Sequence, residues 1–159
     1  MQFLTSIALA LAATGALAAP VTSPIMGVIN TPTASSTIAA NESFDFDYAV
    51  TNWCEEGYNH FKVFMTSGSA APTVDDVDTT GDVESALYSF GEYVVANFGL
   101  PAPTNPPPSS LTAPVVSADA ISEGASTFLT VVQIFSGCPG SVAQEVGVTS
   151  VPFEYSASS

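Results

Sequence analysis

Two segments of the chain alternate strictly between apolar and polar positions. In residues 43–50, SFDFDYAV, aromatic side chains occupy one parity, and Asp45 and Asp47 occupy the other. Residues 58–65 repeat this alternation, with a large apolar side chain at every second position. A period of two is typical of strands with one buried face. Because the segments flank Cys54 and a Glu-Glu-Gly turn, we expect them to form neighbouring strands.

A third segment is apolar at both parities. Residues 126–135, STFLTVVQIF, are rich in β-branched and aromatic side chains, which indicates a central strand covered on both faces. Weaker strand patterns occur at residues 24–29, 87–96, 111–116 and 142–155. Residues 83–95 also fit one or two helical turns, but we favour a strand there. About seven short strands predict an all-β fold, an immunoglobulin-like antiparallel sandwich.

Residues 101–114, PAPTNPPPSSLTAP, interrupt this series of strands. Proline has no backbone N–H to donate to a sheet, so this tract cannot form a central strand. We expect an extended surface connection that lies against the edge of the sheet.

The first residues have the features of a secretory signal peptide. An apolar stretch from Phe3 to Leu17 ends in the small residues Ala16 and Ala18, a pattern that signal peptidase cleaves. We expect removal of residues 1–18, which leaves residues 19–159 as a single secreted domain, extracellular or in a cell wall. A membrane anchor is the alternative, but a spanning helix needs roughly 20 apolar residues.

The charge balance excludes several classes of partner. Lys62 is the only Lys or Arg in the chain, against 15 Asp and Glu, and the net charge is −14. Nucleic acids and anionic membranes are bound by clusters of basic residues, so we expect neither partner. The carboxylates are scattered rather than concentrated in one tail, which favours a folded acidic domain.

The two cysteines, Cys54 and Cys138, are expected to pair. An even number of cysteines in a secreted chain favours a disulfide, and a bond across this separation stabilises by roughly 4 kcal/mol in the loop-entropy model. Free thiols or a metal pair are the alternative. A zinc site needs four ligands, and only His60 is left to join the two cysteines.

The cysteines and the tryptophan resemble the immunoglobulin arrangement, with departures. One cysteine follows an early strand, and the other closes a late central strand. Trp53, however, is adjacent to Cys54 instead of lying on the next strand, and Ser136 stands where a tyrosine is expected.

The order of landmarks is also similar to that of small secreted proteins of mushroom-forming fungi. These landmarks are SPIMGVIN, SFDFDY, GYNHFKVFM, NPPPSSLTAP and SGCPG, and the resemblance spans most of residues 19–159. It implies secretion and a β-sandwich. Members of this group are uncharacterised, so the resemblance implies no activity and transfers no functional residue.

The densest group of oxygen ligands lies in residues 74–84, VDDVDTTGDVE. The order of acids partly resembles an EF-hand loop, but Leu87 stands where the bidentate Glu belongs. We interpret the segment as a solvated acidic loop. The alternative is an irregular, weakly binding Ca²⁺ site, whose candidate ligands are Asp76, Asp78, Asp82 and Glu84, together with the neighbouring Asp75. No other cofactor is indicated.

The catalytic candidates are few. Asp45 and Asp47 share one strand face at about 7 Å, near the separation used in paired-acid hydrolysis, but we interpret them as solvent-facing, as we do the turn residues Glu55 and Glu56. His60 is the only histidine, and no nucleophile motif accompanies it. We therefore expect no catalytic residue.

Two further surface features complete the candidates. Asn41 begins the sequon Asn-Glu-Ser just before a strand, a candidate glycosylation site. Five aromatic residues are candidates for stacking on sugars, although core or edge packing is the simpler interpretation for most of them; they are Trp53, Tyr58, Tyr88, Tyr93 and Phe98.

These observations favour a non-catalytic secreted module associated with the extracellular matrix or cell wall, with polysaccharide as the candidate ligand. A structural or host-interaction surface protein without a small ligand is one alternative. A small hydrolase that uses an acid pair is the other, and a deep pocket holding two carboxylates would support it.

Overall fold

The main sheet is built around the longest strands, with the short β1 at one edge. The computed structural model describes residues 20–138, 140 and 144–157, so the expected signal peptide lies outside the described residues. The sheet has the order β1-β10-β9-β6-β7. Its strands are β1 (Val21–Thr22), β10 (Glu145–Ser156), β9 (Ser126–Phe135), β6 (Tyr58–Gly68) and β7 (Ala86–Ala96).

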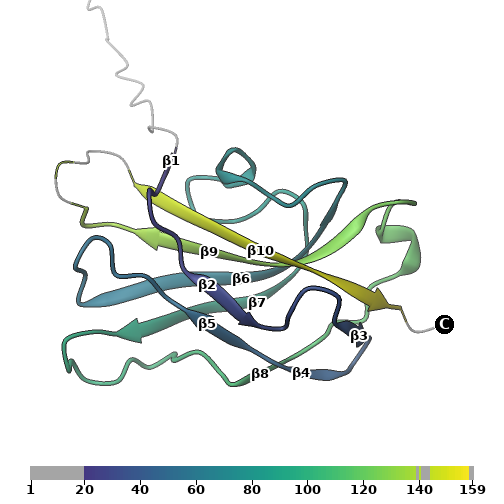
Figure 1. Cartoon of the computed structure of the whole chain (residues 1–159), viewed down its shortest axis with the longest axis horizontal. Coiled ribbons are helices and arrows are strands. Elements are labelled where there is room, and N and C mark those ends of the chain that lie inside the picture. The colour runs from purple at the N-terminus through teal and green to yellow at the C-terminus, as the bar shows by residue number, and fades with distance from the viewer. Residues whose placement is uncertain (1–19, 139, 141–143, 158–159) are drawn as a thin grey trace, which may run out of the picture.

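Short strands form a second layer on one face of this sheet (Figure 1). β2 (Val28–Thr31) pairs with β5 (Asp47–Ala49), and β4 (Ser43–Asp45) pairs with β8 (Ser110–Thr112). β3 (Thr37–Ala39) runs parallel to the end of β10, as β1 does to its beginning. The predicted all-β sandwich is confirmed, with two short parallel pairs added to otherwise antiparallel sheets.

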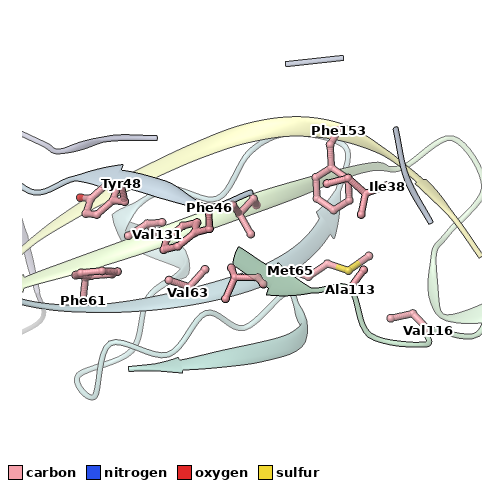
Figure 2. Packing of buried hydrophobic residues seen from close by; sticks show 12 residues of the cluster. Ile38, Phe46, Tyr48, Phe61, Val63, Met65, Ala113, Val116, Val131 and Phe153 are labelled. Atoms are coloured by element: carbon pink, nitrogen blue, oxygen red, sulfur yellow. The ribbon is translucent and has the colours of Figure 1, made fainter. Parts of the chain in front are cut away.

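The core lies between the two layers. Phe61 and Val63 from β6 and Val131 from β9 face Phe46, which lies between β4 and β5, and Tyr48 from β5 (Figure 2). All five side chains are buried. Full burial of a large apolar side chain stabilises by about 1.5–3 kcal/mol. The alternating patterns of the sequence therefore correctly identify the inward-facing positions.

The outer face of the main sheet is also covered, over part of its length. The loop between β6 and β7, which contains the 3₁₀ turn η1 (Val74–Asp76), places Val77 and Val83 on Phe64, Val132 and Val146. This cover explains why β9 is apolar at both parities, as predicted, and why Phe64 is buried although it lies on the polar parity of β6.

Two expectations about the first alternating segment are wrong. Residues 43–50 form two strands, β4 and β5, because the N–H of Phe46 donates to Ser109 O at 2.9 Å and the chain changes partner there. β5 and β6 are not neighbours, since they lie in opposite layers. Proximity in sequence suggested a hairpin, whereas burial of both apolar faces requires the two strands to face each other.

The first part of the proline-rich tract follows the edge of the main sheet, as predicted, whereas residues 110–112 form β8 and bury Leu111 in the core. The N–H of Val94 in the edge strand β7 donates to Asn105 O at 2.9 Å, and the Asn105 amide donates to Glu92 O. Hydrogen bonds to the edge strand occupy backbone groups that otherwise recruit another chain.

The weaker strand predictions are partly confirmed. Residues 86–96 form a strand and not a helix, whereas the first and last elements are displaced from their expected bounds. The structure contains, within the described residues, no helix long and apolar enough to span a membrane.

Candidate functional site

One end of the sandwich is fixed by the predicted disulfide. Cys54, in the loop between β5 and β6, is bonded to Cys138, and their Cα atoms lie 4.4 Å apart. The Glu56 carboxylate strengthens this link because it accepts hydrogen bonds from the N–H groups of Ser136 and Gly137, at 2.7 and 2.8 Å. Glu56 is thus a structural anchor, whereas Glu55 is exposed in the turn, as expected.

A network of asparagine amides ties the next loop to this disulfide end. Asn59 is fully buried, and its side chain donates to Asn52 Oδ1 at 3.2 Å. The Asn97 amide donates to Asn59 Oδ1 at 2.6 Å and to Glu56 O at 2.9 Å. Buried amides need such partners, so Asn97 is held firmly where β7 ends.

Asn97 begins a tight turn that displays a phenylalanine. The N–H of Leu100 donates to Asn97 O at 3.0 Å, and both central residues have positive φ, 54° for Phe98 and 71° for Gly99. These are the features of a type I′ turn, in which Gly, Asn or Asp normally occupies both central positions. The left-handed conformation costs Phe98 about 1 kcal/mol, and the residue is 73% exposed, so burial does not offset this cost.

Two further apolar residues lie beside this turn. Leu100 packs over Gly57, where an added Cβ would lie 2.8 Å from its Cδ1 atom. The hydroxyl of Tyr58 donates to Pro101 O at 3.3 Å. Leu100 and Tyr58 are 42% and 37% exposed. We call Tyr58, Phe98 and Leu100 the Phe98 surface.

The other aromatic candidates lie elsewhere. Trp53 is exposed, and its indole N–H donates to Glu145 at 3.1 Å, toward β10. Tyr88 is exposed on β7 and packs edge to face on Phe90. Tyr93 is half-buried against Phe61. Of the five candidates, Tyr58 and Phe98 lie at the same end of the β6–β7 pair, where Tyr58 is opposite Ala96, and Leu100, which sequence analysis missed, lies beside them.

Several carboxylates of the acidic loop accept hydrogen bonds from other groups of the same loop. Asp76 accepts hydrogen bonds from the N–H and hydroxyl of Thr73 at 2.7 and 2.9 Å. Asp78 accepts from the N–H and hydroxyl of Thr80 and from the N–H of Asp82, at 2.7–2.9 Å. These bonds hold the pKa of Asp76 and Asp78 below the usual value of 3.8. Asp78 is exposed and Asp76 is partly exposed, and both carboxylates stay ionised in all but strongly acidic solution.

Lys62 holds this loop to the sheet. Lys62 lies on β6, and its ammonium is 2.8 Å from Asp82. Its side chain is mostly buried beneath the loop. Glu84 and Asp75 are exposed.

The predicted calcium ligands do not converge in this arrangement. Within the described part of the chain, only Cys54, Cys138 and Glu145 bring three candidate metal ligands within 4.8 Å of one another, and two of these form the disulfide. Calcium binding at Asp76, Asp78, Asp82 and Glu84 stays a prediction from sequence.

The acid pair lines a broad groove. Asp45 and Asp47 border an open depression of about 520 Å³, together with Pro107 and Pro108. Both aspartates are exposed, and Asp47 accepts a hydrogen bond from the Asn30 amide at 2.9 Å. Neither carboxyl group is buried, as a carboxylic acid kept protonated for catalysis usually is.

His60 and Tyr48 lie in contrasting environments, one exposed and the other buried. His60 is exposed on β6, and its Nδ1 atom lies 3.1 Å from Glu92. Burial raises the pKa of Tyr48, next to the groove, so its phenol stays neutral.

Asn41 lies in the turn between β3 and β4. It is exposed, with φ of 62°, and its N–H donates to Ala113 O at 3.0 Å. The side chain of the sequon is thus accessible, and its glycosylation stays a prediction.

Comparison with protein families, curated proteins and solved structures finds no match to this chain.

Proposed function

We propose that the protein is a secreted, non-catalytic module that binds a neutral polysaccharide of the extracellular matrix or cell wall through the Phe98 surface. The observation that carries this proposal is the display of Phe98. The residue is 73% exposed on a left-handed backbone, although the turn is anchored by the amide network around the buried Asn59 and, through Glu56, by the disulfide end. Strain of this kind is concentrated at functional sites.

The chemistry of the Phe98 surface fits sugar. Pyranose rings have an apolar face of C–H groups, and tyrosine and phenylalanine present flat apolar rings with little conformational freedom. A chain with net charge −14 repels acidic polymers, so a neutral polysaccharide is the compatible class. The resemblance of the sequence landmarks to those of small secreted fungal proteins implies secretion.

Several features support a binding function over hydrolysis. Asp45 and Asp47 are exposed in an open groove, and His60 pairs with an exposed glutamate. The carboxyl groups of Asp76 and Asp78 have lowered pKa values, whereas a general acid needs a raised one.

The test is retention of the purified protein, residues 19–159, on insoluble chitin, β-glucan and cellulose in mildly acidic buffer. We expect selective retention on one polymer. Phe98→Ser should weaken retention about tenfold or more, since tenfold corresponds to only about 1.4 kcal/mol of lost contact.

The matched control is Tyr88→Ser, which removes a ring that is 45% exposed on β7, away from the Phe98 surface. This variant should bind as the unaltered protein does. Absence of retention on all three polymers would contradict the proposal and favour the structural or host-interaction alternative.

A further inference from the structure

The turn between β3 and β4 presents the sequon formed by Asn41, Glu42 and Ser43. It is the only Asn-X-Ser or Asn-X-Thr sequence in the chain, and all three of its residues are exposed. Acceptor sequons of secreted proteins lie in surface turns and loops. The place of this sequon in the fold therefore meets the first requirement of a modification site.

The side-chain amide of Asn41 takes no part in holding the fold together. Within the described residues it makes no hydrogen bond, whereas the side chain of every other asparagine makes at least one. Those five residues are Asn30, Asn52, Asn59, Asn97 and Asn105. Attachment of a sugar to Asn41 Nδ2 therefore breaks no hydrogen bond of the described structure, because only water solvates that amide.

Backbone groups and Glu42 fix the shape of this turn. The N–H of Asn41 donates to Ala113 O at 3.0 Å, and the Glu42 carboxylate accepts from the N–H of Ala39 at 2.7 Å. The φ of Asn41 is 62°, a conformation that asparagine and glycine tolerate. This conformation accounts for an asparagine at the position, but not for the serine two positions later that completes the sequon.

The surface beside the sequon leaves room for a glycan. Glu42 and Ser43 border an open depression of about 370 Å³. Thr33, Ser36 and Thr37 are among the other residues that line it. A concave surface that is rich in hydroxyl side chains is compatible with the first sugars of an attached chain.

The sequon lies at the end of the sandwich opposite the Phe98 surface. The N–H of Ala40 donates to Ser156 O at 2.9 Å, where β10 ends. β10 begins at Glu145, beside the disulfide, and a strand of its 12 residues is about 36 Å long. Figure 1 shows β3 and the start of β10 at opposite ends of the molecule. A glycan on Asn41 therefore leaves the Phe98 surface accessible.

We propose that Asn41 carries an N-linked oligosaccharide in the secreted protein. The donor is an oligosaccharide joined through its anomeric carbon to a lipid diphosphate. Asn41 Nδ2 bonds to that carbon, the bond from the carbon to the phosphate oxygen breaks, the lipid diphosphate leaves, and one amide proton passes to a base of the transferase. The transferase recognises the hydroxyl of Ser43 together with the asparagine. This proposal is independent of polysaccharide binding.

The test is the mass of the full chain secreted by a eukaryotic host, measured before and after treatment with peptide-N-glycosidase. This enzyme removes N-linked sugars and converts the asparagine that carried them to aspartate, so peptide mapping identifies the site. We expect a single downward shift in mass, with aspartate in place of Asn41. Asn105, which is exposed outside any sequon, should remain asparagine.

Two variants of Ser43 separate the sequon from the structure of the turn. Ser43→Ala removes the sequon but leaves Asn41 and its backbone conformation in place, so the secreted variant should show no shift in mass. The matched control is Ser43→Thr, which keeps the sequon and suits the exposed position on β4. This variant should show the same shift as the unaltered protein.

An unaltered secreted protein whose mass does not change on treatment would overturn the proposal. A shift that persists in Ser43→Ala would also overturn it, because the sugars would then be attached at another residue.

Discussion

The loop of residues 73–84 and the turn of residues 97–100 differ in whether the fold accounts for their most conspicuous side chains. The loop has five acids, but Asp76, Asp78 and Asp82 are bonded to neighbouring groups of the loop or to Lys62. The turn has no charge, yet it exposes Phe98 on a strained backbone. The hydrogen bonds of these acids stabilise the fold, whereas the exposure of Phe98 does not. An exposed side chain on a strained backbone is therefore a better guide to function here than a dense cluster of acidic groups.

The largest expected effect is a loss of stability when the amide network that anchors the turn of residues 97–100 is broken. Asn97→Ala removes the donor to Asn59 Oδ1, an atom of a fully buried residue, and should lower the free energy of unfolding by about 2 kcal/mol. Urea denaturation measures this loss.

Asn105→Ala is the control, because this asparagine is exposed and bonds only the edge of β7. Its effect should stay within about 0.5 kcal/mol. Equal losses in the two variants would show that the amide network does not anchor the turn.

A smaller effect is expected in the acidic loop. Asp78→Asn weakens the acceptor for Thr80 and Asp82 and should cost less than about 1 kcal/mol at neutral pH, because the group is exposed and screened by solvent. The pKa of Asp78 is lowered in the folded state from its usual 3.8. Its contribution is therefore present above pH 3.8 and is lost as the pH falls through the lower folded value.

Thermal unfolding of Asp78→Asn and of the unaltered protein, at neutral pH and in increasingly acidic buffer, tests this pH dependence. The difference between Asp78→Asn and the unaltered protein should shrink only below about pH 3.8. A difference that persists in strong acid would mean that the aspartate acts by packing and not by its charge.

Sequence patterns predicted the parts of the fold that depend on local alternation. The β9 strand has the predicted bounds, the inward parity of β6 is as expected, and the proline-rich tract lies on the edge of β7. The pairing of β5 and β6 was wrong, because strand pairing depends on which faces meet across the core and not on distance along the chain.

The candidate site was less predictable. Asn97 and Gly99 are typical turn residues, and they flank Phe98 in the sequence, but no local pattern shows that the ring stays in solvent. Leu100 gives no sequence signal either. The sequon at Asn41 was visible in the sequence, but only the structure shows that its side chain is exposed.

Whether the exposed Phe98 ring serves binding is tested by one variant, Phe98→Asn, measured for both stability and polymer retention. Asparagine tolerates the left-handed conformation, so the free energy of unfolding should rise by up to about 1 kcal/mol while retention on the polysaccharide is lost. A gain in stability together with a loss of binding would show that the strained display of the Phe98 ring serves binding at the expense of stability. Retention equal to that of the unaltered protein would show that the Phe98 ring does not bind the polysaccharide.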